Sequence, residues 1–176
     1  MGIDTSATAA SVSICEGERV LSEFFVNVKL THSQTMMPMV KAALDCAMLS
    51  LSDIDVFAVA NGPGSFTGLR IGISAVKGMA FALEKPCVGV STLEAIAQNA
   101  VSIPGILCPV MDARVKQVYN ALFESDGQRM TRLCPDRALT IAELLEELRS
   151  FDRPVILVGD GAELCYREFA EKLPQA

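Results

Sequence analysis

The sequence contains few of the residues that metal and redox sites require. Histidine occurs once in 176 residues, at position 32, which excludes any site that needs two histidines and leaves little for a zinc centre. The cysteines form no C-x-x-C pair, and we expect them to be free and to act as small hydrophobic residues. They are widely spaced along the chain: Cys15, Cys46, Cys87, Cys108, Cys134 and Cys165. The sequence therefore predicts neither a metal centre nor a disulfide framework.

Long apolar runs and basic runs are also missing. Half of the chain is hydrophobic (51%), yet no run approaches the ~20 apolar residues of a membrane span, and no secretory signal pattern opens the sequence. We therefore expect a soluble, cytoplasmic protein. Lys and Arg total 15 against 21 Asp and Glu, a net charge of −6, whereas a protein that holds nucleic acid by itself normally has a basic face. If RNA is involved, we expect another chain to hold it.

Residues 61–72, with the sequence NGPGSFTGLRIG, are the most informative stretch. They follow an apolar run at 56–60 that predicts a buried strand, and Gly62-Pro63-Gly64 predicts a tight turn. Apolar residues then recur at helical spacing to Leu83. The glycines fit neither the dinucleotide fingerprint nor the phosphate loop, which needs Gly-Lys-Ser/Thr. Strand, turn and helix is nevertheless the arrangement in which α/β proteins usually place a site.

Glycines inside this predicted helix indicate a close approach to its backbone. Each costs about 1 kcal/mol relative to alanine, which a helix tolerates when something packs very near. The helix has a second, small-residue stripe beside its larger apolar one, and so has the helix expected to end near Leu49. Ordinary packing within the chain is one explanation, but two such helices favour a partner interface. An arginine at Gly72 should then weaken association and leave the fold intact. The predicted interface is Met39, Ala42, Cys46, Leu49, Gly68, Gly72, Ala75, Met79 and Ala82.

The order of predicted elements indicates an internal repeat. The first half reads as three strands (within 3–15 and at 19–28), a helix, a strand, a helix, a strand at 86–90 and a helix opened by a Ser91–Glu94 capping box. Thr31-His32-Ser33 offers side chains that can cap the first helix, which we expect to run to about Leu49. If Thr35 is the cap instead, Pro38 lies in the first turn; an earlier start would kink the helix there. The second half begins alike, since residues 115–124 match 7–16 at an offset of 108. It continues with a strand at 129–134, a helix capped by Thr140 and Glu143, a strand at 155–158 and a helix at 162–172.

Two such copies predict an α/β fold of the duplicated actin-like ATPase type (ASKHA, ribonuclease H-like). We expect domains at 1–103 and 104–176. The second lacks one strand and one helix of the first, either because the chain is truncated or because this domain is reduced. In that fold an Asp-centred corner of each domain faces phosphate. The candidate corners are Asp4-Thr5-Ser6 and Asp112-Ala113-Arg114. Because the second has no glycine and Arg114 would fill part of its space, we expect a vestigial nucleotide site.

The run GPGSFTGLRIG closely resembles the signature of the TsaB (YeaZ) family. The similarity extends to the opening IDTSATAASVSI, to His32-Ser33, to STLE at 91–94, to MDAR at 111–114 with Val118-Tyr119, and to GDG at 159–161. Two features depart from the family pattern: the first strand is short, and the chain ends before the family's usual last elements.

The resemblance implies a non-catalytic scaffold or activating subunit. TsaB-like proteins pair with the catalytic TsaD, and with the small ATPase TsaE, in the N6-threonylcarbamoylation of adenosine 37 in tRNA. They lack TsaD's pair of metal-binding histidines, in agreement with the lone His32. The implied protein has no catalytic residue, metal or cofactor of its own, with ATP or ADP only in the partner complex. It forms a homodimer when alone, meets tRNA only through the complex and does not bind membranes.

Two enzymatic alternatives remain. A small ATP-dependent kinase of the same fold is the stronger, since the fold is shared with sugar kinases. A protease is weaker, because neither metal ligands nor a nucleophile with a base and an orienting group can be identified.

Overall fold

The computed structural model describes residues 1–28 and 30–169 and divides the chain into two compact units, Met1–Val90 and Ser91–Ala176. The sequence pattern placed the boundary later, between residues 103 and 104. The earlier boundary has a physical reason: helix α3 (Thr92–Gln98) packs against strand β6 (Gly105–Arg114), the central strand of the second unit. None of the helices in the described residues is long and apolar enough to cross a bilayer.

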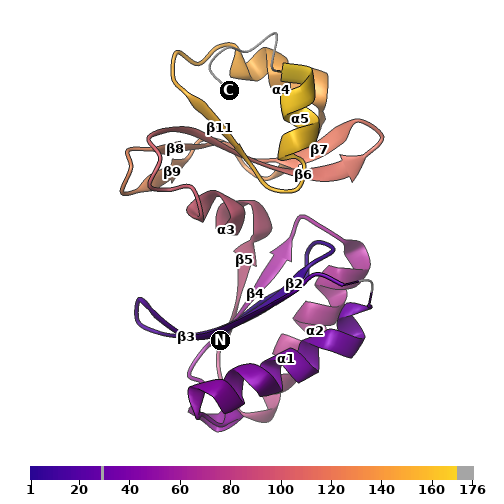
Figure 1. Ribbon diagram of the computed structural model, residues 1–176, viewed down its shortest axis with the longest axis vertical. Coiled ribbons are helices and arrows are strands. Elements are labelled where there is room, and N and C mark those ends of the chain that lie inside the picture. Colours follow the sequence, from indigo (N-terminus) through magenta and orange to yellow (C-terminus); the bar gives the residue numbers. More distant parts are fainter. Residues whose placement is uncertain (29, 170–176) are drawn as a thin grey trace. The chain divides into compact units, whose positions relative to one another are not determined.

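The first unit is a five-stranded sheet covered on one face by two helices (Figure 1). The strands lie in the order β3-β2-β1-β4-β5, with β1 antiparallel to β2 and parallel to β4. Helix α1 packs on β2 and β3, and helix α2 on β1 and β4. The predicted order of elements is confirmed, with one added 3-10 turn, η1 (Leu51–Asp53). The elements are β1 (Gly2–Asp4), β2 (Ala10–Glu16), β3 (Arg19–Val26), α1 (His32–Ala47), β4 (Phe57–Gly62), α2 (Phe66–Ala82) and β5 (Cys87–Ser91).

Alternation along β2 explains how this sheet forms its core. Val12 and Ile14 are buried beneath the helices, whereas Ser11 and Ser13 between them point the other way, as the two-residue period of a strand requires. The helices contribute Val40 and other apolar side chains to the same cluster. The expected cap at residues 31–33 is confirmed, and the alternative cap at Thr35 is not adopted. Helix α1 begins at His32, because Thr31 and Gln34 form a capping box, and Pro38 lies inside it.

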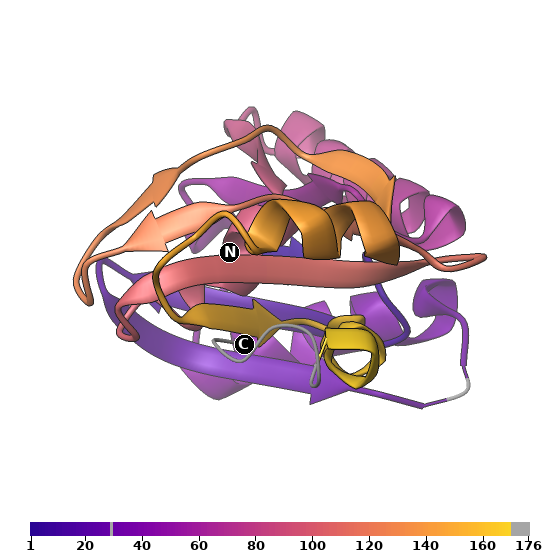
Figure 2. The same ribbon diagram turned by 90° about the horizontal axis from the view of Figure 1, so that it is seen from above.

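The second unit repeats most of this plan around the ten-residue strand β6. Strand β6 pairs in parallel with β11 and antiparallel with β7 and β8, and Figure 2 shows it running between them. Helices α4 and α5 pack side by side. The predicted end of the last helix, at Lys172, lies outside the described residues. The elements are β7 (Gln117–Asn120), β8 (Phe123–Ser125), β9 (Met130–Arg132), β10 (Arg137–Thr140), α4 (Ile141–Leu148), β11 (Val155–Val158) and α5 (Ala162–Phe169).

A buried asparagine marks where the second unit departs from the first. The single strand β2 corresponds to two strands here, β7 and β8, with a bend after Asn120. The Asn120 side chain is fully buried, and its Nδ2 lies 3.0 Å and 2.9 Å from the carbonyl oxygens of Pro109 and Ala121. Its Oδ1 accepts a hydrogen bond from Arg137 Nη2 at 3.2 Å. One side chain thus joins β6, the bend and β10.

Candidate functional site

The turn after β4 lies directly on the first Asp-centred corner. The Ser65 backbone N–H donates to the Ser6 carbonyl oxygen at 2.6 Å, and the Thr5 hydroxyl donates to the Gly68 carbonyl oxygen at 2.8 Å. Ser65 also caps α2, because its Oγ accepts from the Gly68 N–H at 3.3 Å. Thr5 and Ser6 are both buried. Residues 62–68 therefore close over residues 4–6 by backbone and hydroxyl contacts.

Three glycines make this closure possible. A β-carbon at Gly64 would collide with the Ser6 carbonyl oxygen, one at Gly68 with the Thr5 carbonyl oxygen, and one at Gly72 with Thr5 Oγ1. Gly64 also has a φ of +154°, which favours glycine. The expectation that something approaches the α2 backbone closely is confirmed for these residues. What approaches is the chain's own corner.

The predicted partner interface needs a correction for four of its members. Gly68, Gly72, Met39 and Met79 are buried inside the first unit and do not face another subunit. Both helices carry two apolar stripes because each contacts the sheet and also the other helix. An arginine at Gly72 would therefore disrupt the unit rather than only its association. The assignment stays a prediction for exposed Cys46 and Ala82 and for half-buried Ala42, Leu49 and Ala75.

The single histidine belongs to the same corner. His32 Nε2 lies 2.8 Å from the Ala7 carbonyl oxygen, and its ring borders the space beside Gly68. Within residues 1–28 and 30–169, no three His, Cys, Asp or Glu side chains gather closely enough to share a metal ion. The contacts of His32 give it a structural role, tying the start of α1 to the corner.

The second corner has the same aspartate hydrogen bond as the first. Asp112 Oδ1 accepts from the Arg114 backbone N–H at 2.7 Å, just as Asp4 Oδ1 accepts from the Ser6 N–H at 2.7 Å. The two hydrogen bonds are separated by the offset of 108 residues found in the sequence. Both lie at the end of the central strand of their unit, β1 or β6. This shared hydrogen bond supports the internal repeat that the sequence pattern predicted.

Gly159-Asp160-Gly161 closes the second corner, as the turn after β4 closes the first. The Gly161 N–H donates to the Val110 carbonyl oxygen at 3.1 Å, and the Asp112 N–H donates to Asp160 Oδ1 at 3.4 Å. Burial raises the pKa of Asp160; the Asp112 N–H lowers it, and the Asp112 carboxylate adds to the rise. This corner therefore holds two acidic side chains near each other, and each adds negative charge where it is ionised. An anionic corner disfavours a bound phosphate.

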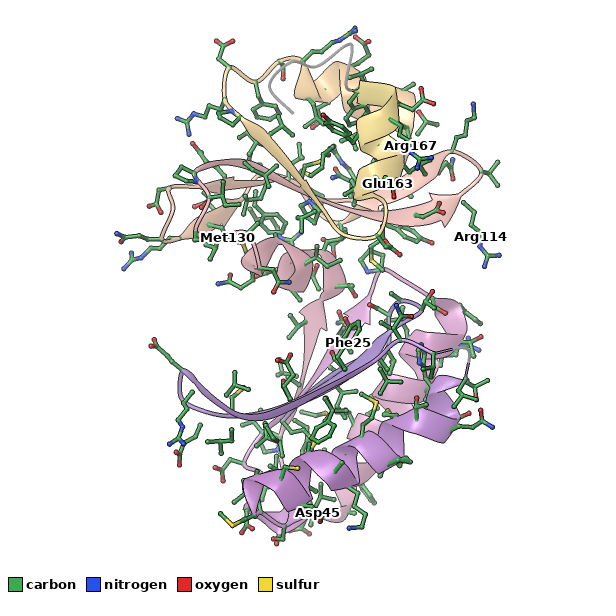
Figure 3. All side chains as sticks on the ribbon, in the orientation of Figure 1. Phe25, Asp45, Arg114, Met130, Glu163 and Arg167 are labelled. Atoms are coloured by element: carbon green, nitrogen blue, oxygen red, sulfur yellow. The ribbon has the colours of Figure 1, made fainter. Side chains whose placement is uncertain are left out.

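The expectation for Arg114 is also corrected. Its side chain is exposed and points away from the ribbon at the β6–β7 hairpin, so it does not fill the corner (Figure 3). The corner is closed instead through backbone groups: the N–H groups of Arg114 and Asp112 donate to carboxylates, as does that of Ser6 in the first unit. Phosphate recognition by a backbone loop depends on N–H groups that point at the ligand. These three N–H groups already have partners within the chain.

Comparison with known proteins identifies the family. Residues 20–173 match the family described as TsaD, tRNA N6-adenosine threonylcarbamoyltransferase. The chain is 34% identical over 164 residues to the tRNA threonylcarbamoyladenosine biosynthesis protein TsaB of Bacillus subtilis, covering 93% of this chain and 72% of that protein. It is 39% identical over 164 residues to TsaB of Escherichia coli, covering 92% of this chain and 71% of that protein. The chain belongs to the TsaB family.

A solved structure agrees with this assignment and with the fold. YeaZ from Pseudomonas aeruginosa superposes with a TM-score of 0.71 at 34% sequence identity, covering 79% of this chain and 67% of its own. The TsaB resemblance and the actin-like fold class predicted from the sequence are both confirmed. In this TsaB-family chain the glycine-rich signature is a structural element that seats α2 on the Asp4 corner.

Sequence reasoning missed the exposed apolar side chains of the TsaB-family helices. Phe81 and Phe66 on α2 are 88% and 68% exposed, and Met48 next to α1 is 91% exposed. The signal was present: Phe66, Arg70, Ser74, Lys77 and Phe81 are spaced by three or four residues and form one stripe. All five are exposed in the structure.

Proposed function

We propose that this chain is a non-catalytic accessory subunit in the biosynthesis of N6-threonylcarbamoyladenosine at position 37 of tRNA. It pairs with a TsaD-like catalytic subunit, is joined by a TsaE-like ATPase and forms a homodimer when alone. Membership of the TsaB family carries the proposal, because the relatives are described as tRNA threonylcarbamoyladenosine biosynthesis proteins. The proposed assembly works in the cytoplasm, without contact to a membrane.

The chemistry of the two corners supports an accessory role. The N–H groups at both corners donate to the chain's own carboxylates or carbonyls, and the second corner holds two carboxylates. ATP or ADP then belongs to the partner complex, and this chain needs no cofactor of its own. A net charge of −6 gives little counterion release on binding RNA, so tRNA is held through the complex.

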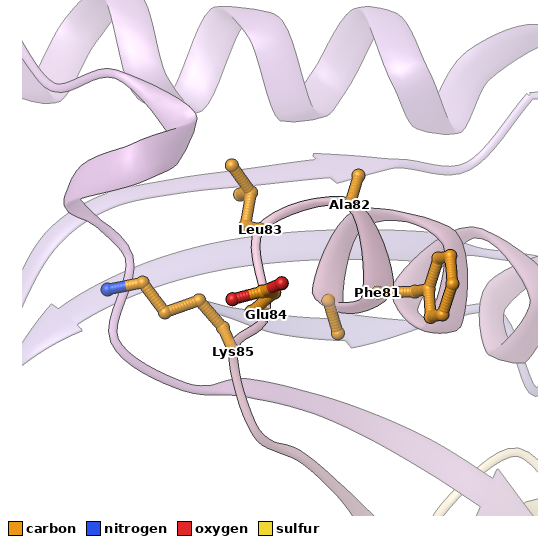
Figure 4. Close-up of a pocket in the computed structure, with 6 residues that line it drawn as sticks. Phe81, Ala82, Leu83, Glu84 and Lys85 are labelled. Carbon is orange, nitrogen blue, oxygen red and sulfur yellow. The ribbon is translucent and has the colours of Figure 1, made fainter.

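The outer surface of α1 and α2 is the best candidate for the partner interface. Exposed aromatic side chains stand at both ends of α2, Phe66 at the first residue and Phe81 next to the last. Arg70 stacks over the Phe66 ring at 3.7 Å beside a shallow hollow of about 380 Å³. Figure 4 shows Phe81 at the other end, beside a hollow of about 770 Å³. Arg70 and Lys77 are the charged residues of α2, so the complementary partner surface is apolar with acidic groups.

Replacing Phe81 with serine should weaken association at least tenfold. Buried aromatic anchors often contribute 2 kcal/mol or more at an interface, and about 1.4 kcal/mol corresponds to a factor of ten in the dissociation constant. Titration with a TsaD-like subunit, together with sedimentation of the chain alone, measures both proposed contacts. The monomer should remain folded, because Phe81 is 88% exposed.

Phe25→Ser is the matched control for this variant. Phe25 is 66% exposed in the same unit, and its side chain lies on the face of the sheet opposite the helices, because its neighbours Phe24 and Val26 pack into the core beneath them. It should associate like the unmodified chain. Equal behaviour of the two variants would show that the α1–α2 surface is not the interface.

The purified chain should neither hydrolyse Mg-ATP appreciably nor modify tRNA unless the TsaD-like subunit is added. The occupied N–H groups at both corners give the physical reason. Phosphate release and tRNA nucleoside analysis measure the two activities, and filter binding should find no saturable tRNA complex with this chain alone. ATP turnover that disappears in Asp4→Ala or Asp112→Ala would favour a kinase of the same fold.

A further inference from the structure

A cluster of polar side chains binds the first turn of α3 to the segment that follows β8. The Ser91 hydroxyl donates to Asp136 Oδ2 at 2.6 Å, and Ser91 Oγ also accepts from the Glu94 N–H at 3.2 Å. Arg132 donates from Nη2 to Glu94 Oε2 at 2.9 Å and from Nη1 to Asp136 Oδ1 at 2.6 Å. We call Ser91, Glu94, Arg132 and Asp136 the α3 anchor. Glu94 thus binds Arg132 instead of completing the capping box that the sequence predicted.

The central arginine of the anchor is itself held in place. Its guanidinium stacks over the ring of Phe123, a buried residue, at 4.6 Å. Burial alone would lower the pKa of Arg132, but the hydrogen bonds to Glu94 and Asp136 raise it above its usual value. The arginine and Asp136 side chains are about one-third exposed or less, 31% and 28%. The anchor is therefore a partly buried network, which contributes more than an isolated surface ion pair.

The anchor lies at the boundary between the two compact units. Strand β5 of the first sheet ends at Ser91, α3 begins at Thr92, and the units divide between Val90 and Ser91. No stretch of separate linker residues lies between the strand and the helix. The segment after α3 is also attached to the second unit, because the Ser125 hydroxyl donates to the Val101 carbonyl oxygen at 2.5 Å. Residues 91–101 are thus fixed to the second unit near both ends.

We propose that the α3 anchor fixes where the second unit begins. Helix α3 already packs on β6 with Leu93 and Ala97 buried, and the anchor adds the polar contacts that hold its first turn, so that residues 91–101 open and close as part of the second unit. Without the anchor, the first turn of α3 would open separately from β6. This inference goes beyond the accessory role proposed above and requires no partner protein, so it can fail or hold independently.

Hydrogen exchange measured by mass spectrometry on the full chain tests this proposal. In the unmodified chain, α3 amides should be protected together with those of β6, with no fast-exchanging segment between β5 and α3. In Arg132→Ala, exchange in residues 92–101 should accelerate by about tenfold or more, whereas β5, β6 and β11 keep their protection. Arg149→Ala is the matched control, because it removes a surface arginine–glutamate pair from α4 of the same unit. The control should leave α3 exchange unchanged.

Glu94→Gln keeps the test decisive if Arg132→Ala fails to fold. It removes one charge from the anchor and leaves the stack of Arg132 on Phe123 in place. It should accelerate exchange in the same residues by a smaller factor. Unchanged α3 exchange in the folded variants would overturn the proposal. So would an even acceleration over the whole second unit, which would make Arg132 an ordinary packing residue, or loss of protection in β5.

Discussion

Replacing Gly68 with alanine is expected to destabilise the first unit by about 3 kcal/mol. The new β-carbon would collide with the Thr5 carbonyl oxygen, a backbone atom that cannot rotate away, and would press on the His32 ring. The better helix propensity of alanine offsets only about 1 kcal/mol of this cost. Urea unfolding of the purified chain, followed by circular dichroism, measures the change.

Gly78→Ala is the matched control within the same helix. Gly78 is exposed, and a β-carbon there would meet nothing within 4 Å. This substitution should stabilise the helix by up to about 1 kcal/mol. If the two alanine variants unfolded at the same urea concentration, α2 would not sit as closely on the Asp4 corner as described.

Replacing Asn120 with leucine is expected to cost the second unit about 3 kcal/mol. Leucine would leave the carbonyl oxygens of Pro109 and Ala121 without the amide that now binds them, and would remove a partner of Arg137. Each buried polar group left unsatisfied costs about 1–3 kcal/mol. The same urea titration applies, and loss of the bend should also increase hydrogen exchange in β8.

Asn99→Leu serves as the comparison for that variant. Asn99 is an exposed asparagine at the end of α3, in the same unit, so its replacement should change stability by less than about 0.5 kcal/mol. An Asn120→Leu protein as stable as Asn99→Leu would show that the bend does not depend on the buried amide.

Much of the fold follows from local signals in the sequence. The strand at Val155–Val158 and the start of α4 at Ile141 were predicted at the observed residues. The capping box of Thr140 and Glu143 explains the second case, because it acts between residues three positions apart. The repeat at an offset of 108 residues was also visible in the sequence, and in both copies an aspartate accepts a hydrogen bond from the backbone N–H two residues later.

Features that depend on contacts between distant residues could not be predicted. A helical period shows that α2 has two apolar stripes but not that Gly72 faces Thr5, 67 residues earlier. Likewise, Glu94 on α3 has the spacing of a capping box, yet Arg132 on strand β9 provides a stronger, charged partner. Strand β10 was missed because this four-residue strand is defined by its pairing with β7, which local sequence does not show. The TsaB signature can therefore be recognised from its residues alone, whereas its physical role follows only from the structure.

The contact between the α2 turn and the Asp4 corner has a consequence for behaviour at low temperature. It consists of hydrogen bonds, Ser65 to Ser6 and Thr5 to Gly68, and of glycines that bring backbone to backbone. Apolar burial supplies the large heat-capacity change of folding and weakens on cooling. A contact with little apolar surface contributes little to that change. As the apolar core beneath the helices loses its driving force in the cold, this contact keeps more of its strength.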